Sequence, residues 1–213
     1  MRIGELSRRT GVPVPTIKFY LREGLLPSGE LTSHNQAQYG ESHLHRLKLV
    51  RAMTEVGKLS VAAARDVLAT IDEPGLSLHK VLGTAQIAVT PQVAPGTDEA
   101  WQQAEQLVTE LIGRLGWEVP PVYPARQALE QLVVTIRDLG QDDLLDLLDD
   151  YAAAARQLAA AEVGLIGRRE GLDSRIEGVV LGTVLGDALI GALRRLAQLD
   201  TSRQIFDADA ATP

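Results

Sequence analysis

The stretch TGVPVPTIKFYLREGLLP, at residues 10–27, decides the fold of the N-terminal region. A short helix before it ends at Gly11, because a glycine adopts positive φ at the least cost. Pro13 and Pro15 then fall at the cap and in the first turn of a second helix, where a missing N–H costs little. That helix continues to Gly24. Two short helices joined by a tight, glycine-containing corner predict a helix-turn-helix.

Outward from this corner the chain continues as a polar segment and then as helices. Residues 28–39 are rich in Ser, Gly, Asn and Gln, with too few apolar side chains for a helix, so they predict a short hairpin, the wing. Ser42 is expected to cap the next helix and Ser60 the one after Gly57. Residues 72–75, Asp-Glu-Pro-Gly, break the chain, so we place a domain boundary after residue 72.

The rest of the chain predicts helices, so the expected fold class is mainly α. Residues 73–96 form a linker with a short helix, 97–200 a helical domain and 201–213 a flexible tail. Gly178, Gly182 and Gly186 recur every four residues on the last long helix and indicate close helix packing or room for a ligand. Aspartates crowd residues 142–150, but interleaved leucines favour a solvated acidic face over a cation site.

Charge divides the chain in the same place. Residues 1–70 hold ten Lys/Arg and six Asp/Glu, a net charge of +4, whereas residues 71–213 hold eleven and twenty-two, a net charge of −11. The whole chain carries −7, which taken alone argues against nucleic acid. The asymmetry favours a basic module that meets phosphate. Two differently charged segments that meet no nucleic acid would give the same numbers.

Composition argues against several function classes. The chain has no cysteine, which removes disulfides, thiolate metal sites and cysteine nucleophiles and fits a reducing cytoplasm. The first residues lack the apolar core of a signal peptide, and the apolar run 179–193 falls short of the roughly 20 residues that a membrane span needs. No nucleophile–base pair or phosphate-binding glycine loop appears. We therefore expect a cytoplasmic protein that is not an enzyme, with no cofactor, metal site or membrane partner.

An ordered set of motifs runs through about the first 72 residues. It comprises Ile3-Gly4-Glu5-Leu6, Thr10-Gly11-Val12, Thr16-Ile17-Lys18-Phe19-Tyr20 and Gly24-Leu25-Leu26-Pro27, then Tyr39, Leu44, Arg46-Leu47 and Gly57 with Leu59-Ser60. In this order the motifs resemble the MerR family of transcription regulators. The resemblance implies a homodimer with a winged helix-turn-helix in each protomer and a dimerisation helix after it. It also implies binding to a pseudo-palindromic promoter site in double-stranded DNA, alongside RNA polymerase, and control through DNA deformation.

The resemblance places the DNA contacts on the second helix, the wing and a later helix–helix corner. The predicted contact residues are Thr16, Lys18, Phe19, Tyr20, Asn35, Gln36, Gln38, Tyr39 and Lys58. On the second helix, Thr16, Lys18 and Tyr20 carry donors within one turn that can reach phosphate or a base edge. Phe19 faces either the core or a thymine methyl. The wing departs from the family at Asn35-Gln36-Ala37, because Ala37 cannot contact phosphate as the family's arginine would.

The C-terminal region leaves three functions open. The leading interpretation is a sensor of an organic, largely apolar ligand, and the large aromatics Trp101, Trp117, Tyr123 and Tyr151 are its candidate pocket residues, although each is more often plain core. The alternatives are a helical protein-interaction module with secondary DNA binding, and an architectural DNA binder with no effector. Residues 97–115 are expected to pair two protomers because their apolar stripe spans about five turns, with 77–89 as the alternative.

Overall fold

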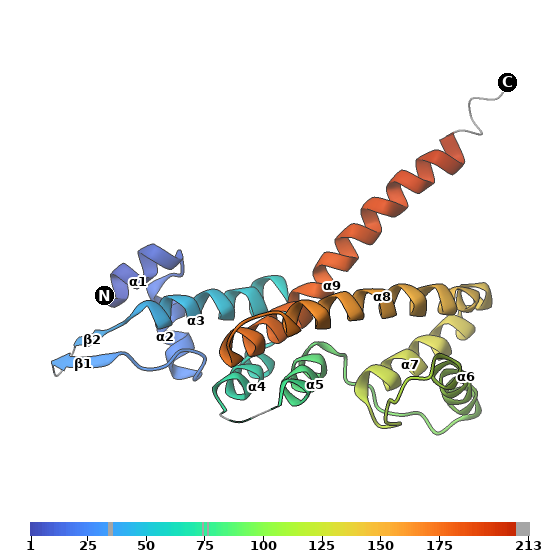
Figure 1. Cartoon of the computed structure of the whole chain (residues 1–213), viewed down its shortest axis with the longest axis horizontal. Coiled ribbons are helices and arrows are strands. Elements are labelled where there is room, and N and C mark those ends of the chain that lie inside the picture. The colour runs from blue at the N-terminus through green and yellow to red at the C-terminus, as the bar shows by residue number, and fades with distance from the viewer. Residues whose placement is uncertain (34–35, 74, 76, 208–213) are drawn as a thin grey trace. The chain divides into compact units, whose positions relative to one another are not determined.

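The computed structural model describes residues 1–33, 36–73, 75 and 77–207, so the predicted contact residue Asn35 lies outside the described residues (Figure 1). Helices dominate, and the mainly α fold class is confirmed. The chain divides into unit 1 (Met1–Val89 with Leu172–Pro213) and unit 2 (Thr90–Gly171). This division differs from the predicted one, because the last long helix packs onto helices of the N-terminal segment. The roles predicted for residues 73–96 and 97–200 stay predictions.

Unit 1 begins with the predicted helix-turn-helix. Helix α1 (Ile3–Thr10) ends at Gly11, which has φ 70° and donates its N–H to the Ser7 carbonyl at 2.8 Å. Helix α2 (Val14–Arg22) follows Pro13 without a side-chain cap and has a proline in its first turn. Leu6 of α1 and Ile17 of α2 are fully buried. The two short apolar faces therefore close on each other and on the core, as the corner sequence predicts.

The wing is a two-stranded antiparallel hairpin. Strand β1 (Glu30–Ser33) pairs with β2 (Gln36–Gln38), and Glu30 lies opposite Gln38. Just after β2, the Tyr39 N–H donates to the Met1 carbonyl at 2.8 Å, and the N-terminal ammonium of Met1 donates to the Tyr39 carbonyl at 2.6 Å. The base of the wing is therefore held against the start of the chain.

Two helix pairs complete the core of unit 1. Helix α3 (Glu41–Arg51) runs into the π-helical turn η1 (Ala52–Val56), and α4 (Val61–Asp72) and α5 (Leu78–Val89) follow. The Ser60 hydroxyl accepts from the Ala63 N–H at 3.1 Å, which confirms that cap. The predicted cap at Ser42 is wrong. The N-cap of α3 is Gly40, whose N–H donates to the His43 ring at 3.0 Å, because an imidazole one turn into the helix can satisfy it.

Helix α9 (Leu172–Ser202) returns to unit 1 and continues as the π-helical turn η3 (Arg203–Asp207). Its first half packs against α4, α5 and η1 through four buried side chains: Ile176, Val179, Val180 and Val184. The side chains of its second half are largely exposed. The predicted close packing at the glycines is not found at Gly182, where an added Cβ would meet no atom within 4 Å.

Among the described residues, one helical stretch, Ser174–Phe206, is long and apolar enough to cross a membrane, judged by length and composition alone. This differs from the expectation for residues 179–193, because the helix extends beyond that run at both ends. The share of its most apolar window that is buried within the protein is 28%.

Unit 2 contains α6 (Glu99–Leu115), α7 (Pro124–Asp138), the 3-10 turn η2 (Asp142–Leu147) and α8 (Leu148–Gly167). The apolar stripe of α6 is buried, and α7 packs against it; Ala104, Val108 and Val133 form the centre of the cluster. The prediction that residues 97–115 pair two protomers rested on this stripe being free. The structure covers this stripe from within the chain through α7, and the pairing of two protomers by residues 97–115 stays a prediction.

Helix α7 contains a buried ion pair whose arginine also donates a hydrogen bond to α6. The Arg126 Nε donates to Glu130 Oε1 at 2.9 Å, and its Nη2 donates to the Thr109 hydroxyl at 2.6 Å. Both charged side chains are almost fully buried. A charge in this position is tolerated only while its partner is present. The i, i+4 spacing of an arginine and a glutamate is the sequence signal that the analysis of the sequence did not use.

Candidate DNA-binding surface

Helix α2 presents a polar face with a cationic edge. Lys18 is exposed, Thr16 and Phe19 are half-buried, and Arg22 lies one turn beyond Lys18 on the same exposed face. Arg22 was not among the predicted contacts, although its spacing of four residues from Lys18 is visible in the sequence. Two cations one helical turn apart suit neighbouring phosphates along one strand.

Tyr20 does not lie on this face. It is 8% exposed, its ring lies 5.9 Å from that of Phe19, and its carbonyl accepts the Leu25 N–H at 2.9 Å. Tyr20 is a predicted DNA contact because it shares a helical turn with Lys18. Its position two residues on from Lys18 turns it about 200° around the helix, toward the core. Tyr20 packs at the end of α2, and its contact with DNA stays a prediction.

The wing places its glutamines outward and its tyrosine inward. Gln36 and Gln38 are exposed, and Arg2 donates from Nη2 to Gln36 Oε1 at 3.0 Å. Tyr39 is 7% exposed and stacks edge-on against His43 with 5.2 Å between ring centroids. Tyr39 therefore packs at the base of the wing, and its contact with DNA stays a prediction. Arg2 adds a cation there that the sequence analysis did not name.

The start of the wing requires a residue without a side chain. A Cβ added to Gly29 would lie 2.6 Å from the Gln38 carbonyl oxygen and 3.0 Å from a Tyr39 ring carbon. Contacts under 3.0 Å force the backbone to move. Gly29 therefore fixes how closely the incoming chain passes β2, and with it the direction of the hairpin.

Lys58 occupies the corner between η1 and α4 in a left-handed conformation. Its φ is 57°, and it is the one non-glycine with positive φ among the described residues. This conformation costs a lysine roughly 1–2 kcal/mol. The corner around it is fixed by the Gly57 N–H, which donates to the Ala52 carbonyl at 2.9 Å, and by the Leu59 N–H, which donates to the Met53 carbonyl at 3.0 Å. The Lys58 side chain is held exposed on a rigid corner.

The ten cations of residues 1–70 fall into two groups. Five are in ion pairs: Arg8 with Glu5, Arg9 with Glu41, Arg46 with Asp72, Arg51 with Glu55, and Arg65 with Glu23. The other five make no ion pair within the described residues; they are Arg2, Lys18, Arg22, Lys48 and Lys58. We call this second group the unpaired cations. They are the charges that a phosphate backbone can use without displacing a carboxylate.

Two of the ion pairs change the acidity of their carboxylates. The side-chain hydrogen bond from Arg9 lowers the pKa of Glu41, and that from Arg51 lowers the pKa of Glu55, each from an ordinary value of 4.5. The pKa values of Arg9 and Arg51 are raised for the same reason. All four side chains are therefore charged at neutral pH, and the pairs hold α1 to α3 and α3 to η1.

The four aromatic candidates of unit 2 have different surroundings. Trp101 is buried in the stripe of α6, Trp117 lies under the Arg156 guanidinium at 5.8 Å, and Tyr151 is exposed. Tyr123 is half-buried, and this burial raises its pKa. The described residues contain no group of three or more His, Asp or Glu side chains placed to hold a metal ion.

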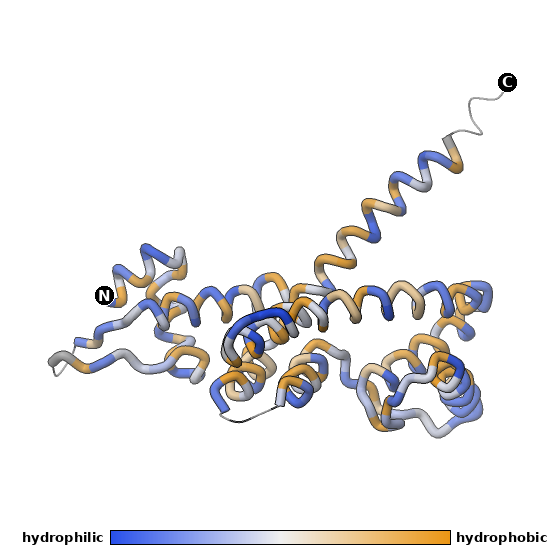
Figure 2. Tube along the Cα trace, in the orientation of Figure 1, coloured by the Kyte–Doolittle hydropathy of each residue, from blue (hydrophilic) through white to orange (hydrophobic). Residues whose placement is uncertain are grey.

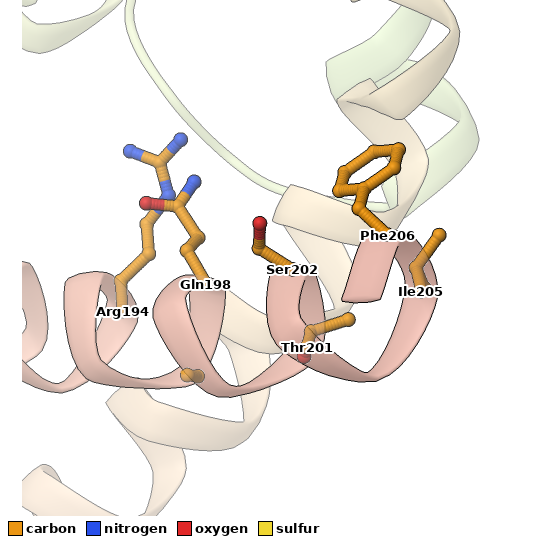
Figure 3. A pocket seen from close by; sticks show the side chains of 7 residues that line it. Arg194, Gln198, Thr201, Ser202, Ile205 and Phe206 are labelled. Atoms are coloured by element: carbon orange, nitrogen blue, oxygen red, sulfur yellow. The ribbon is translucent and has the colours of Figure 1, made fainter. Parts of the chain in front are cut away.

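An apolar hollow lies on α9 and η3 rather than among these aromatics (Figure 3). Its lining side chains are Arg194, Ala197, Gln198, Thr201, Ser202, Ile205 and Phe206. All of them belong to one helical segment, so the hollow is shallow and open along one face of the helix. The predicted ligand residues contribute nothing to it.

Known proteins resemble this chain over two different lengths. Residues 1–71 match the family described as MerR HTH family regulatory protein. The HTH-type transcriptional regulator ZntR homolog of Haemophilus influenzae is 44% identical over 50 residues, which are 24% of this chain and 37% of that protein. The mercuric resistance operon regulatory protein of Bacillus cereus is 39% identical over 56 residues, 26% of this chain and 42% of that protein. The chain thus spans about two fifths of the length of these curated relatives.

One solved structure resembles the chain over almost its whole length. It is the crystal structure of SCO5550 from Streptomyces coelicolor A3(2), described as a transcriptional regulator. It is 35% identical in sequence, with a TM-score of 0.63, and the match covers 97% of this chain and 98% of that one. The chain belongs to the MerR family of helix-turn-helix regulatory proteins, and its residues 1–71 are the family's domain.

Proposed function

We propose that this protein is a sequence-specific DNA-binding transcription regulator that acts as a homodimer on a pseudo-palindromic promoter site. The observation that carries the proposal is the placement of the unpaired cations. Lys18 and Arg22 stand on the exposed face of the second helix of a helix-turn-helix, which is the element that enters the major groove in this motif. An acidic protein that binds DNA needs its free positive charge concentrated in this way.

Each part of the surface has a distinct task in this proposal. Lys18 and Arg22 meet phosphates and Thr16 a base edge, so α2 both positions the protein and reads sequence. Gln36 and Gln38 of the wing, with Arg2 beside them, meet the backbone outside the groove. Lys58 clamps a further phosphate from the corner. A homodimer repeats this set on two half-sites, separated by one or more helical turns of about 34 Å.

The same proposal gives the C-terminal region an organic, largely apolar ligand. Several relatives are described as mercuric resistance or heavy-metal-dependent regulators, but their matches cover 26–32% of this chain. This chain has no cysteine, so a thiolate site of the kind that favours soft metals has no ligands here. A coupling of about 1–3 kcal/mol between ligand and DNA would change DNA affinity by roughly 5–150-fold.

DNA binding is tested with the fragment upstream of the protein's own coding sequence, by fluorescence anisotropy at several salt concentrations. Lys18→Ala and Arg22→Ala should each weaken binding and reduce the salt slope, because each removes one phosphate contact per protomer. Lys80→Ala, an exposed cation on α5 outside this surface, is the matched control and should change neither. Equal effects from all three variants, or no binding to any duplex at low salt, would refute the proposal.

A helical protein-interaction module is the second candidate function, and one observation favours it. Of α8, only Ala152 is buried in the described structure, while Leu158, Val163 and Leu165 are exposed.

Trp101 and Trp117 are the chain's only tryptophans, and both lie in unit 2, so their fluorescence reports on this region. A saturable response to lipophilic or neutral organic compounds, altered by operator DNA, supports the sensor. A response to transition metals alone contradicts it.

A further inference from the structure

Helix α8 and the turn η2 before it expose a continuous row of large apolar side chains. We call this row the α8 face, and each of its side chains is between 36% and 50% exposed. It consists of Leu144 and Leu147 of η2 and of Tyr151, Leu158 and Leu165 of α8. Figure 2 shows apolar positions recurring along this helix between polar ones. A contiguous apolar row of this kind marks an interaction surface.

The spacing of these residues keeps the row on one side of the helix. In the 3-10 turn η2, residues three apart eclipse, so Leu144 and Leu147 lie in line. The three large residues of α8 recur every seven residues, which is about two helical turns. The small exposed side chains of Ala154 and Ala161 lie between them. Large and small side chains therefore alternate along the α8 face, which allows a second helix to approach closely.

The opposite side of α8 is fixed to α6 and to the residues that follow it. The Arg114 Nη2 donates to Asp149 Oδ1 at 2.8 Å, and the Arg156 Nη2 donates to the Leu115 carbonyl. The same Arg156 guanidinium lies 5.8 Å from the centre of the Trp117 ring. These contacts hold α8 by one side and present the α8 face in a fixed orientation. A partner that binds there finds the helix already ordered.

Aspartates border the first half of the α8 face. Asp143, Asp146 and Asp150 each come directly before a residue of the face, so they lie along one edge of it. All three are exposed, and none of them makes an ion pair within the described residues. Unit 2 as a whole holds six Lys/Arg and fourteen Asp/Glu in residues 90–171, a net charge of −8. The electrostatic potential at this edge is therefore negative and attracts a cationic partner.

We propose that the α8 face binds an amphipathic helix of another protein that carries Lys or Arg beside its apolar stripe. The inference rests on the interaction module given above as the second candidate function, and it names the chemistry of the partner. Helix α8 is about 30 Å long, so the complementary helix has about 20 residues. Its apolar side chains pack between those of the α8 face, and its cations reach the aspartates at the edge.

The same charges argue against other occupants of the face. A second copy of the chain would bring one unit of net charge −8 against another, and like charges repel. Anionic lipid and DNA would meet the aspartates in the same way. A small organic ligand requires a concave pocket, whereas the α8 face is the outer side of a single helical segment.

The position of the aspartates also indicates the direction of the partner helix. They lie at the N-terminal end of α8 and in the turn before it. A partner that runs antiparallel to α8 brings its last turns to this end. Cations in the last turns of a helix also interact favourably with the dipole of that helix. We therefore expect the partner to carry its cations in its C-terminal half.

Fluorescence anisotropy of a labelled peptide, titrated with the chain, tests the α8 face. The probe is a designed amphipathic helix of about 20 residues, built from Leu, Ala, Gln and Lys, with its lysines in the C-terminal half. Leu158→Gln and Leu165→Gln together should raise the Kd of the probe about ten-fold, since glutamine keeps the helix propensity and loses the apolar contact. The matched control changes Leu132 and Leu139, exposed leucines in α7 and at its end, to glutamine. It should leave the Kd within about two-fold.

A second set of variants tests the charge. Asp143→Asn, Asp146→Asn and Asp150→Asn together should raise the Kd about ten-fold at low salt and much less at 1 M salt, where screening removes the attraction. The matched control neutralises three other exposed carboxylates of unit 2 and changes its net charge equally. They are Glu105, Glu118 and Asp138. Equal losses from the two triple variants would reduce the binding to net charge and overturn the proposal, as would an unchanged Kd in the double leucine variant.

Hydrogen exchange of the chain, with and without the probe, locates the contact. The expected result is slower exchange at residues 144–165, and protection confined to other segments would contradict the proposal. Two further results would assign the face to another occupant and overturn the inference. One is self-association of the chain that the double leucine variant abolishes. The other is cosedimentation with phosphatidylglycerol vesicles that the same variant abolishes.

Failure of this inference is distinguishable from failure of the proposed regulator. The double leucine variant should retain the operator affinity of the unsubstituted chain, because Leu158 and Leu165 lie in unit 2, outside the DNA-binding surface. Binding of the probe without binding of DNA supports the α8 face and contradicts the regulator. Operator binding by a chain that does not bind the probe contradicts the α8 face and leaves the regulator standing.

Discussion

Replacing Lys58 with glycine should stabilise the folded protein and at the same time lower its affinity for DNA. Lys58 has φ 57°, a conformation that glycine adopts freely and lysine does not. It is also an exposed cation that makes no ion pair within the described residues. A residue kept strained on a rigid corner is a reason to look for function there. The two effects have opposite signs, so a single variant separates backbone strain from charge.

The expected changes in folding stability and in the salt dependence of DNA binding can each be worked out. Relief of the left-handed strain is worth roughly 1–2 kcal/mol, and the extra unfolded-state entropy of glycine offsets about 0.5–1 kcal/mol of it. A net gain near 0.5–1 kcal/mol raises the Tm by about 1–4 °C for a chain of this size. On DNA, each lost phosphate contact reduces the salt slope by about 0.9, and a homodimer loses two, or about 1.8. Between 50 and 200 mM salt that difference amounts to roughly a twelve-fold smaller loss of affinity.

The assay pairs thermal unfolding with anisotropy titrations at four salt concentrations. Lys58→Gln is the matched control: it keeps the strained backbone and removes the charge, so it should lose the same salt slope without a rise in Tm. Lys58→Arg should retain both properties of the native residue. An unchanged slope in Lys58→Gly would show that the corner does not meet phosphate. A lowered Tm would show that the left-handed turn is not a source of strain.

Three further predictions concern stability. Gly57→Ala should cost about 1–3 kcal/mol in urea unfolding, because the added methyl overlaps a valine of α9; a neutral effect would mean that α9 is not seated on the corner. Arg126→Met should cost about 3–5 kcal/mol by stranding Glu130, whereas a double change that also replaces Glu130 with leucine should recover most of it. The lowered pKa values of Glu41 and Glu55 contribute stability that is present above about pH 4.5 and lost as pH falls through their folded values. Glutamine at both positions should flatten that acid limb, and an unaltered Tm–pH curve would contradict it.

The helix-turn-helix was predictable because its determinants are local. Gly11 and the prolines after it define the corner by backbone conformation alone, and the structure places α1 and α2 where they require. The wing was predictable for the same reason, from a polar run too poor in apolar residues for a helix. The directions of Tyr20 and Tyr39 were less accessible, because a contact motif names a residue type while the helix or strand register decides which side it faces.

Long-range packing explains what the sequence did not reveal. The apolar stripe of α6 has the pattern of a dimerisation helix, and the same pattern serves equally well for packing against α7. An apolar periodicity predicts that one face of a helix is buried, but it does not identify the segment that packs against that face. The return of α9 to unit 1 depends on contacts between residues more than 100 positions apart, such as His45 with Glu177. No local signal in either segment identifies the other.

The order of the elements constrains how a ligand signal would reach DNA. Unit 2 is inserted in the sequence between α5 and α9, and the covalent chain passes between the two units at residues 89–90 and 171–172. Those two junctions lie at the end of α5 and at the start of α9, which pack against each other. A ligand that alters the distance between the two ends of unit 2 therefore acts on the α5–α9 pair. Because α9 also contacts the Gly57 corner, we propose that an effector would reach the DNA-binding surface through that pair.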